Sequence, residues 1–300
     1  METSQTVGPN KATKTHKKMA KISIVILQYN NSVDSLRCLE SVKGLDYPDW
    51  SVIVVDNHSD NFHLNSIRMW VESHDNQRFS FIANNANLGY TGGNNVGIRQ
   101  ALERGSDYIL ILNPDTTVAS DLLTKLVAAA EPERGIGIVG TFPGRIQWLK
   151  AELPLSDRLT PDSDFYLSGA CLLVKKSVIE RVGLLDENYF LYFEDADYCV
   201  RARRAGFQLK LVPAGLVQHQ VSASTGALGA PLLLRYHFRN ALYFNWRYAP
   251  LQYKIRLPFW SFWIILKQLA KLILQPAKRI AAKAILAGVM DFHLDRMGKI

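Results

Sequence analysis

Five short apolar runs, separated by stretches with helical spacing, constrain the fold of this chain more than any other feature. The runs are rich in β-branched residues and apolar on both faces, as strands inside a parallel sheet must be. They are ISIVIL (22–27), SVIVVD (51–56), FSFIAN (79–84), YILILN (108–113) and IGIVGTF (136–142). The stretches between them predict helices at roughly 32–43, 61–73, 92–104 and 119–130. This alternation predicts a doubly wound α/β fold with an open, mostly parallel sheet.

The pattern changes after the fifth run. PGRIQWLKAELPLSDRLTPDSDF (143–165) has prolines and charges but no clear period, and it predicts a long loop that covers or lines a site. SGACLLVKK (168–176) then predicts another strand, FEDADYCVRARRAG (193–206) a helix that ends on Gly206, and QLKLVP (208–213) a last strand running toward His219.

Charge is distributed unevenly along the chain, whose formal net charge is +8. The last 100 residues carry 16 lysines and arginines against 2 acidic residues, whereas the first 200 carry 19 against 25. A basic appendage on a mildly acidic body suits an anionic partner, either phospholipid or nucleic acid. A solvated face that only aids solubility would have the same composition.

Part of the basic appendage has an amphipathic helical pattern. On a helix, one stripe is formed by Phe262, Trp263, Leu266, Leu269 and Ile273, and another by Lys267, Lys271, Gln275 and Lys278. Leu257–Leu266 is a run of only ten uncharged residues, which we expect to be too short to span a bilayer. The pattern predicts a helix on an anionic membrane surface; the alternative is an ordinary amphipathic helix packed on the domain.

The cysteines and the N-terminus indicate a reducing compartment. Cys38, Cys171 and Cys199 are widely spaced and form no C-x-x-C motif. Residues 1–20 are polar and lysine-rich and lack the apolar core of a signal peptide, so we expect a disordered basic tail. The predicted location is cytoplasmic.

Polar loops follow four of the predicted strands, namely LQYNN (27–31), DNHSD (56–60), NNANLGYTGGNN (84–95) and NPDTT (113–117). The carboxyl ends of parallel strands meet at one sheet edge, where ligands bind. Each loop alone could be an ordinary turn. The glycine-rich loop lets the backbone approach a ligand, and we expect the following helix to offer free N–H groups to an anion. It matches neither the P-loop nor the dinucleotide-binding motif, so those two classes are set aside.

Two further groups of residues could carry chemistry. Asp115, at a strand end, could hold a divalent cation that stabilises a leaving diphosphate, with His219 as a second ligand. Glu194, Asp195 and Asp197 lie among aromatic residues at a helix start, where burial and the helix dipole shift a carboxyl pKa in opposite directions. That balance suits a general base. The alternatives are an ordinary turn, a structural histidine, and carboxylates that cap the helix and pair with the arginines after them.

Six separated motifs together resemble family 2 glycosyltransferases, especially rhamnosyltransferase-like bacterial members. They are ISIVILQYNN, VIVVDNHSD, NNANLGYTGGNNVGI, YILILNPDTTV, SGACLLVKKSVIERVGLLDENYFLYFEDADYCVRARRAG and LVPAGLVQH, and RNALYF (239–244) follows them. The resemblance covers about residues 21–245. It implies the GT-A (Rossmann-like) fold, a mostly parallel sheet flanked by helices, with a nucleotide-diphospho-sugar donor, a divalent metal (Mn²⁺ or Mg²⁺) and inversion at the anomeric carbon.

The resemblance also implies roles for single residues. Those matching donor-binding positions are Tyr29, Asn30, Asp56, Asn87, Gly89, Gly93, Asn94 and Asn113. Asn113-Pro-Asp115 stands where the family has its D-x-D metal motif, with Asn113 replacing the first Asp, and His219 matches an additional metal ligand. Asp195 matches the catalytic base, Glu194 is expected to position the acceptor, and Asp197 is expected to be structural.

The expected activity is transfer of a sugar, rhamnose by subgroup resemblance, from a dTDP- or UDP-sugar to a hydroxyl of a lipid-linked or growing cell-surface glycan. The expected divisions are a tail at 1–20, a GT-A domain at 21–245 and a C-terminal basic amphipathic helical extension at 246–300, peripheral on the inner face of the bacterial membrane. Nucleic acid is not expected as a partner. The alternatives are a metal-dependent nucleotidyltransferase and an inactive module that binds nucleotide-sugar or nucleic acid.

Overall fold

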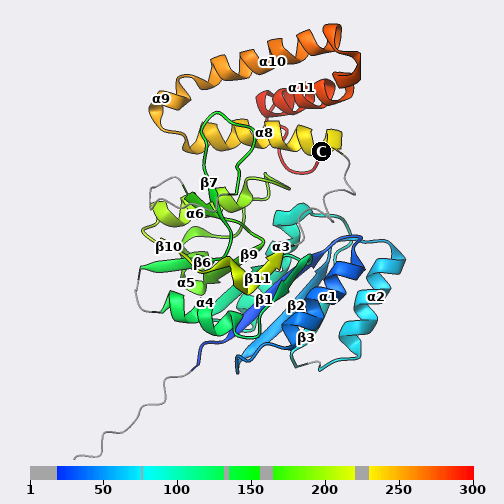
Figure 1. Ribbon diagram of the computed structural model, residues 1–300, viewed down its shortest axis with the longest axis vertical. Helices are drawn as coiled ribbons and strands as arrows, with labels where there is room; N and C mark the ends of the chain where they lie inside the picture. The colour runs from blue at the N-terminus through cyan, green and yellow to red at the C-terminus, as the bar shows by residue number, and fades with distance from the viewer. Residues whose placement is uncertain (1–18, 76, 132–134, 156–164, 220–229) are drawn as a thin grey trace, which may run out of the picture.

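The computed structural model describes residues 19–75, 77–131, 135–155, 165–219 and 230–300 (Figure 1). Nearly all of the tail expected at 1–20 lies outside these residues. The central sheet has seven strands in the order β10-β6-β9-β4-β1-β2-β3. They are β1 (Ile22–Gln28), β2 (Trp50–Asp56), β3 (Phe79–Ala83), β4 (Tyr108–Leu112), β6 (Ile136–Gly140), β9 (Cys171–Lys175) and β10 (Gln208–Leu211).

The predicted α/β fold with a mostly parallel sheet is confirmed. β1 pairs in parallel with β2 and β4, and β2 pairs in parallel with β3. The exception is β9, which runs antiparallel to both of its neighbours, β4 and β6. No residue within SGACLLVKK distinguishes a parallel from an antiparallel strand, so the sequence did not predict the direction of β9.

Helices cover both faces of the sheet. α1 (Ser32–Lys43), α2 (Asn61–Glu72) and α4 (Leu122–Ala130) pack into one core, with strand residues such as Ile24 and Val52. α3 (Gly89–Glu103), α5 (Lys176–Val182) and α6 (Glu194–Arg204) pack into the other, with Val25 and Ile53. Alternate residues of each strand thus point into different cores, which explains why the runs are apolar on both faces.

Short strands complete the edge of the sheet that carries the polar loops. β5 (Thr116–Val118) pairs antiparallel with β11 (Val217–His219). β7 (Pro143–Arg145) pairs with β8 (Phe165–Leu167), so the stretch predicted as a loop has short strands at its two ends. Residues 156–164 of that stretch lie outside the described part of the chain.

The C-terminal part forms a separate layer of helices above α6 (Figure 1). It contains α8 (Ala230–Tyr248), α9 (Leu251–Lys254), α10 (Leu257–Leu274) and α11 (Arg279–His293). α8 contributes Ala241, Phe244 and Tyr248 to the sheet core and Leu242 to the core between helices. Because α8 runs through position 245, the helix belongs to both layers, and a domain division at that point stays a prediction.

α10 packs with a face other than the predicted stripe. Its buried residues are Leu257, Ser261, Ile264 and Gln268, whereas the five residues of the apolar stripe are between 42% and 74% exposed. The expectation that this segment is too short to cross a membrane was wrong. By length and composition alone, Leu251–Leu274 is long and apolar enough to cross one, and only 22% of its most apolar stretch is buried. Core helices of soluble proteins can meet them too.

Candidate functional site

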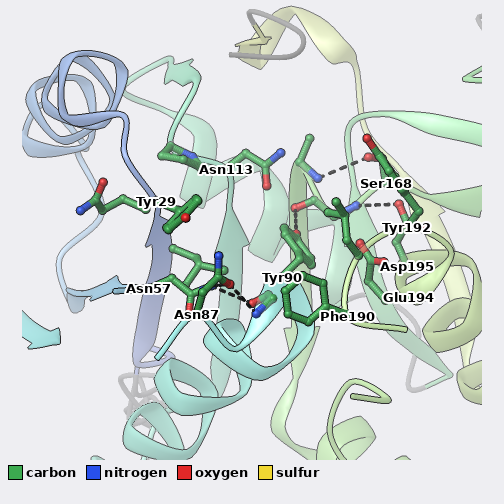
Figure 2. Close-up of a pocket in the computed structure, with 17 residues that line it drawn as sticks. Tyr29, Asn57, Asn87, Tyr90, Asn113, Ser168, Phe190, Tyr192, Glu194 and Asp195 are labelled. Atoms are coloured by element: carbon green, nitrogen blue, oxygen red, sulfur yellow. Dashed lines mark hydrogen bonds between the residues drawn. The ribbon is translucent and has the colours of Figure 1, made fainter. Parts of the chain in front are cut away.

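A cavity of about 240 Å³ opens at the carboxyl ends of β1 and β4. Its wall combines these strand ends with the start of α3 and the loop before α6 (Figure 2). The predicted site residues that line it are Tyr29, Asn87, Gly89, Asn113, Glu194 and Asp195. The predicted residues outside this lining are Asn30, Asp56, Gly93, Asn94, Asp115 and His219. The cavity therefore joins the predicted donor loops to the predicted base, although Asn87 and Asp195 are more than 100 positions apart.

Asp56 is fully buried behind the cavity wall. Its Oδ2 accepts a hydrogen bond from the Ser59 N–H at 2.9 Å, and its Oδ1 accepts one from Gln28 Nε2. Gln28 itself lines the cavity, so Asp56 holds a side chain of the cavity wall. Asn30 has a left-handed backbone (φ 48°) and accepts a hydrogen bond from the Asp60 N–H at 2.8 Å. In this structure both residues shape the loops around the cavity.

Asn57 organises the glycine-rich loop, a role that the sequence did not reveal. Its Nδ2 donates to Asn87 Oδ1 and to the Gly89 carbonyl, both at 3.0 Å, and its Oδ1 accepts from the Leu88 N–H at 3.0 Å. Asn87 Oδ1 also accepts from the Gly89 N–H at 2.8 Å. Two asparagines from different strand ends therefore hold the loop in one conformation.

The start of α3 does not offer its first N–H groups to a ligand, contrary to expectation. The Tyr90 N–H donates to the Phe190 carbonyl at 2.7 Å, and the Thr91 N–H lies 3.5 Å from the same oxygen. Gly89 adopts a φ of +73°, and a Cβ there would lie 2.5 Å from Phe190. The glycine thus allows two protein segments to approach each other closely, and the segment carrying Phe190 occupies the place predicted for an anion.

Gly93 and Asn94 serve packing. A Cβ on Gly93 would lie 2.4 Å from Leu27, so the glycine lets α3 pack closely on β1. Asn94 Nδ2 donates to the Tyr90 carbonyl at 2.9 Å, while its buried Oδ1 accepts no hydrogen bond from the described residues.

Asp115 and His219 are brought together by the β5–β11 pair. His219 Nε2 lies 3.1 Å from Asp115 Oδ1, and the Asp115 side chain is only 3% exposed. That oxygen accepts no well-formed hydrogen bond from the described residues. An orphaned carboxylate oxygen beside an imidazole nitrogen is a suitable start for a divalent-metal site. The described residues contain no group of three such ligands, so a metal here would also need oxygens from its ligand or from water.

Glu194 and Asp195 begin α6 at the cavity wall (Figure 2), and the pKa values of both carboxyl groups are raised. Asp195 Oδ1 accepts from the Ala196 N–H at 2.7 Å and Oδ2 from the Gly169 N–H at 3.2 Å. Burial nevertheless raises the pKa of Asp195, because desolvation outweighs these bonds. Burial and the adjacent Asp195 raise the pKa of Glu194 well above its ordinary value, and Glu194 Oε2 accepts no hydrogen bond from the described residues.

Asp197, two residues further, faces the opposite side of α6. It is fully buried and pairs with Arg201 Nε at 2.6 Å. It also accepts hydrogen bonds from the Tyr248 hydroxyl at 2.6 Å and the Tyr189 hydroxyl at 3.3 Å. The structural alternative of carboxylates paired with arginine therefore applies to Asp197.

Sequence reasoning missed several cavity residues, namely Gln28, Asn57, Tyr90, Ser168, Phe190 and Tyr192. Gln28, Asn57 and Tyr90 lie next to predicted residues, so the motifs marked the right loops without marking every side chain in them. Phe190, Tyr192 and Phe193 have left-handed backbones, with φ of 60°, 71° and 74°. Such conformations cost about 1–2 kcal/mol each for residues other than glycine, and they cluster at functional sites. Aromatic residues there give no sequence signal of that strain.

Curated relatives of this chain include a hexosyltransferase and rhamnosyltransferases. The chain is 28% identical over 217 residues to the low-salt glycan biosynthesis hexosyltransferase Agl10 of Haloferax volcanii, spanning 63% of each protein. It is 24% identical to the dTDP-rhamnosyl transferase RfbF of Shigella flexneri, over 79% of this chain and 84% of that one. It is 26% identical to the N-acetylglucosaminyl-diphospho-decaprenol L-rhamnosyltransferase of Mycobacterium tuberculosis, over 78% and 89%.

The fold is shared with solved GT-A enzymes. The mannosyltransferase PcManGT of Pyrobaculum calidifontis, solved with GDP-Man and Mn²⁺, superimposes with a TM-score of 0.61 at 16% identity, covering 93% of this chain and 88% of that one. The family model for "Glycosyl transferase family 2" matches residues 23–183, which is more than half of the chain and includes both the glycine-rich loop and Asp115. The predicted family is thereby confirmed: this chain belongs to glycosyl transferase family 2.

Proposed function

We propose that this protein is an inverting glycosyltransferase that moves a sugar from a nucleoside-diphosphate donor to a hydroxyl of a lipid-linked or growing cell-surface glycan. The observation that carries the proposal is Asp195, a carboxylate at the cavity wall whose pKa is raised by burial. Rhamnose is the first sugar to test, because two relatives are named as rhamnosyl transferases.

In the proposed reaction Asp195 accepts the proton of the acceptor hydroxyl. The hydroxyl oxygen forms a bond to the anomeric carbon as the bond from that carbon to the diphosphate oxygen breaks. The nucleoside diphosphate leaves with the bonding electrons, and attack from the opposite side inverts the carbon. Glu194, which burial favours in its protonated form, donates a hydrogen bond that positions the acceptor.

The donor occupies the end of the cavity formed by Tyr29, Asn87, Gly89 and Asn113. The Tyr29 ring is suited to stack on a base, and Asp56 acts on the base through Gln28. These contacts would accept any base; dTDP- or UDP-sugars are the proposed donors because one relative is named as a dTDP-rhamnosyl transferase and a solved neighbour of the same fold was solved with UDP-GlcNAc.

Asp115 and His219 would hold the divalent ion, Mn²⁺ or Mg²⁺, together with oxygens of the donor diphosphate. When bound, such an ion neutralises negative charge that develops on the leaving diphosphate. Asn113 contributes no charge, so we expect ion binding to be weak until the donor supplies its phosphates.

Thermal unfolding with UDP, dTDP, GDP and CDP, each with Mn²⁺, with Mg²⁺ and without metal, tests the donor site. A ligand at 100 times its Kd adds about 2.7 kcal/mol, which raises the midpoint by several degrees. We expect a metal-dependent rise for UDP or dTDP. In Asp115→Asn the metal-dependent part of the rise in midpoint should disappear. Asp121→Asn, which changes an exposed acid directly before α4, should behave as wild type.

Turnover then separates the alternatives. Release of a nucleoside diphosphate from a sugar nucleotide supports glycosyl transfer. Release of pyrophosphate from a nucleoside triphosphate would instead identify a nucleotidyltransferase, and nucleotide binding without turnover an inactive module.

We further propose that the outer face of α10 lies on the inner, anionic surface of the membrane. This face consists of Phe259, Phe262, Trp263, Leu266, Leu269 and Ile273, all exposed. It lies opposite the buried residues Leu257 and Ile264; Lys267 lies beside it, and Lys271, one turn later, lies closer to the buried side. Aromatic and apolar residues flanked by lysines suit a headgroup interface better than contact with nucleic acid, for which the aromatic face provides no charge.

Sedimentation with vesicles tests the membrane proposal. Phe262→Glu combined with Leu266→Glu should abolish binding to phosphatidylglycerol vesicles. The control is Phe62→Glu, a phenylalanine on α2 that is 71% exposed against 60% for Phe262. If the α10 variant still sediments with the vesicles, or if wild type binds neutral and anionic vesicles equally, the proposed surface is wrong.

A further inference from the structure

The loop that leads into Glu194 and Asp195 is the most strained segment of the cavity wall. Phe190, Tyr192 and Phe193 all have positive φ, and Phe190 and Tyr192 line the cavity. Such a backbone persists only where its surroundings determine it. The contacts that determine it come largely from one turn and a half of α8, residues 236–240.

Asn240 binds the carbonyl oxygens of this loop. Its Nδ2 lies 2.9 Å from the Tyr189 oxygen, 2.7 Å from the Leu191 oxygen and 3.1 Å from the Tyr192 oxygen. The side chain is fully buried. Two amide hydrogens thus serve three carbonyls that the left-handed residues turn toward α8.

Arg239 joins the same loop to the C-terminal residues of the chain. Its Nη2 donates to the carbonyls of Asn188 (3.3 Å) and Tyr189 (3.2 Å), and its Nη1 to those of Arg296 (3.2 Å) and Gly298 (2.8 Å). Its Nε donates to Asn240 Oδ1 at 3.0 Å, which orients the amide. The buried guanidinium is therefore compensated by backbone oxygens from two segments of the chain.

Aromatic stacking adds to these bonds. Phe190 stacks on Tyr236 with ring centroids 5.1 Å apart, and Tyr192 stacks on His237 at 3.9 Å. On its other side the loop contacts the start of α3, the segment predicted to surround the donor (the donor segment), because the Phe190 carbonyl accepts a hydrogen bond from the Tyr90 N–H. One loop thus sets the distance between the donor segment and the carboxylates.

We propose that Arg239 and Asn240 are positioning residues for the transfer reaction. By binding the carbonyls of residues 188–192, they hold Glu194 and Asp195 and the aromatic wall in register with the donor, and the C-terminal residues 296–298 complete this arrangement. The inference rests on the proposed function, because it concerns the rate of that reaction.

The test compares pairs of variants on the same helix. Asn240→Ala should lower kcat by about 10²-fold, the scale of a misplacement near 1 Å, while the KM for the donor and the Kd for its nucleoside diphosphate stay near wild type. Asn245→Ala is the control, because Asn245 is equally buried on α8 but holds the Leu149 N–H. It should lower the unfolding midpoint and leave kcat unchanged.

The same comparison applies to the arginine. Arg239→Lys retains the charge but loses the branched donors, and we expect kcat to fall with donor affinity retained. Its control is Arg235→Gln, because Arg235 pairs with Asp291 of α11 and makes none of the described bonds to the loop.

Should Asn240→Ala fail to fold, deletion of residues 298–300 provides a second route. It removes the Gly298 carbonyl and the Gly298 N–H that donates to Asn188 at 2.8 Å. We expect a lower kcat at an unchanged nucleotide Kd, whereas Lys299→Ala, which keeps both groups, should match wild type.

The outcomes are distinguishable. An inactive wild type would overturn the proposed function, and this inference with it. An active wild type with equal losses of kcat in Asn240→Ala and Asn245→Ala, or with the loss of Asn240→Ala confined to donor affinity, would overturn the positioning role alone.

Discussion

The carboxylates on the two sides of the first turn of α6 lie in different environments. On the core side, Asp197 is compensated by Arg201 and two tyrosine hydroxyls. On the cavity side, Glu194 leaves one oxygen without a hydrogen bond from the described residues, and burial raises the pKa of both Glu194 and Asp195. Burying a carboxyl group without a full set of hydrogen bonds costs free energy, so two such groups at a cavity indicate use by a ligand rather than support of the fold.

The largest expected effect is on the cavity side. Asp195→Asn keeps the size of the side chain but removes the proton acceptor, so we expect transfer to fall by about 10²–10⁴-fold. Nucleotide binding and the unfolding midpoint should remain, as measured by calorimetry and thermal unfolding. Turnover retained at the wild-type rate would remove Asp195 from the mechanism.

On the core side we expect the reverse. Asp197→Asn leaves Arg201 without its carboxylate, which should destabilise the protein by about 2–3 kcal/mol, less than a fully buried pair because Arg201 is partly exposed. Denaturant unfolding measures the loss, and activity below the unfolding transition should persist. A variant that is stable but inactive would erase the contrast between the two sides.

The pH dependence of the rate follows from the raised pKa of Asp195. Burial raises this pKa to about 6, and only the ionised form accepts the proton. The rate should fall about tenfold for each pH unit well below that value, because the ionised fraction of Asp195 falls tenfold. A rate that stays level down to pH 4.5 would contradict the proposed base.

The smallest expected effect concerns stability. Because the folded protein holds the Glu194 proton more tightly than the unfolded chain does, this group contributes stability at low pH that is lost as the pH rises above the ordinary carboxyl range. The change in unfolding midpoint that Glu194→Gln causes should therefore be more favourable at pH 8 than at pH 5. If the substitution has the same effect at both pH values, folding does not raise the pKa of Glu194.

Deletion of the C-terminal helices is not a clean test of membrane binding. Deleting everything after residue 250 would remove α10, but also the Asp291 partner of Arg235 and the carbonyls of residues 296 and 298 that bind Arg239. Such a deletion would confuse membrane release with damage to the cavity wall. Point substitutions on the outer face of α10 avoid this.

Short-range pattern was sufficient to locate most strands of the sheet and the loops of several site residues. β-branched runs located the strands to within one or two residues for β1 to β4, because their apolar faces are read directly from adjacent residues. Loops at strand ends pointed to the segments of Tyr29, Asn87 and Asn113, since parallel strands bring their ends to one edge. Asp195 was indicated separately, by carboxylates among aromatic residues at a helix start and by the family resemblance.

Contacts between distant segments could not be read in this way. The Phe190 carbonyl occupies the start of α3, about 100 positions earlier in the chain, so the predicted anion site is filled by protein. Asn57 and Gln28 acquired roles through the side chains that face them, and the packed face of α10 was decided by α8 and α11.

The sequence by itself determined the fold class, the family and the sheet edge that carries the cavity, because these depend on local periodicity and on motifs in a recognisable order. Only the tertiary structure decided which groups Asp195 and Asp197 bond to, which N–H groups at the start of α3 are already bonded, and that residues 296–298 support the loop before Asp195 through Arg239. Those features depend on burial and on hydrogen bonds between distant residues, for which adjacent residues carry no signal.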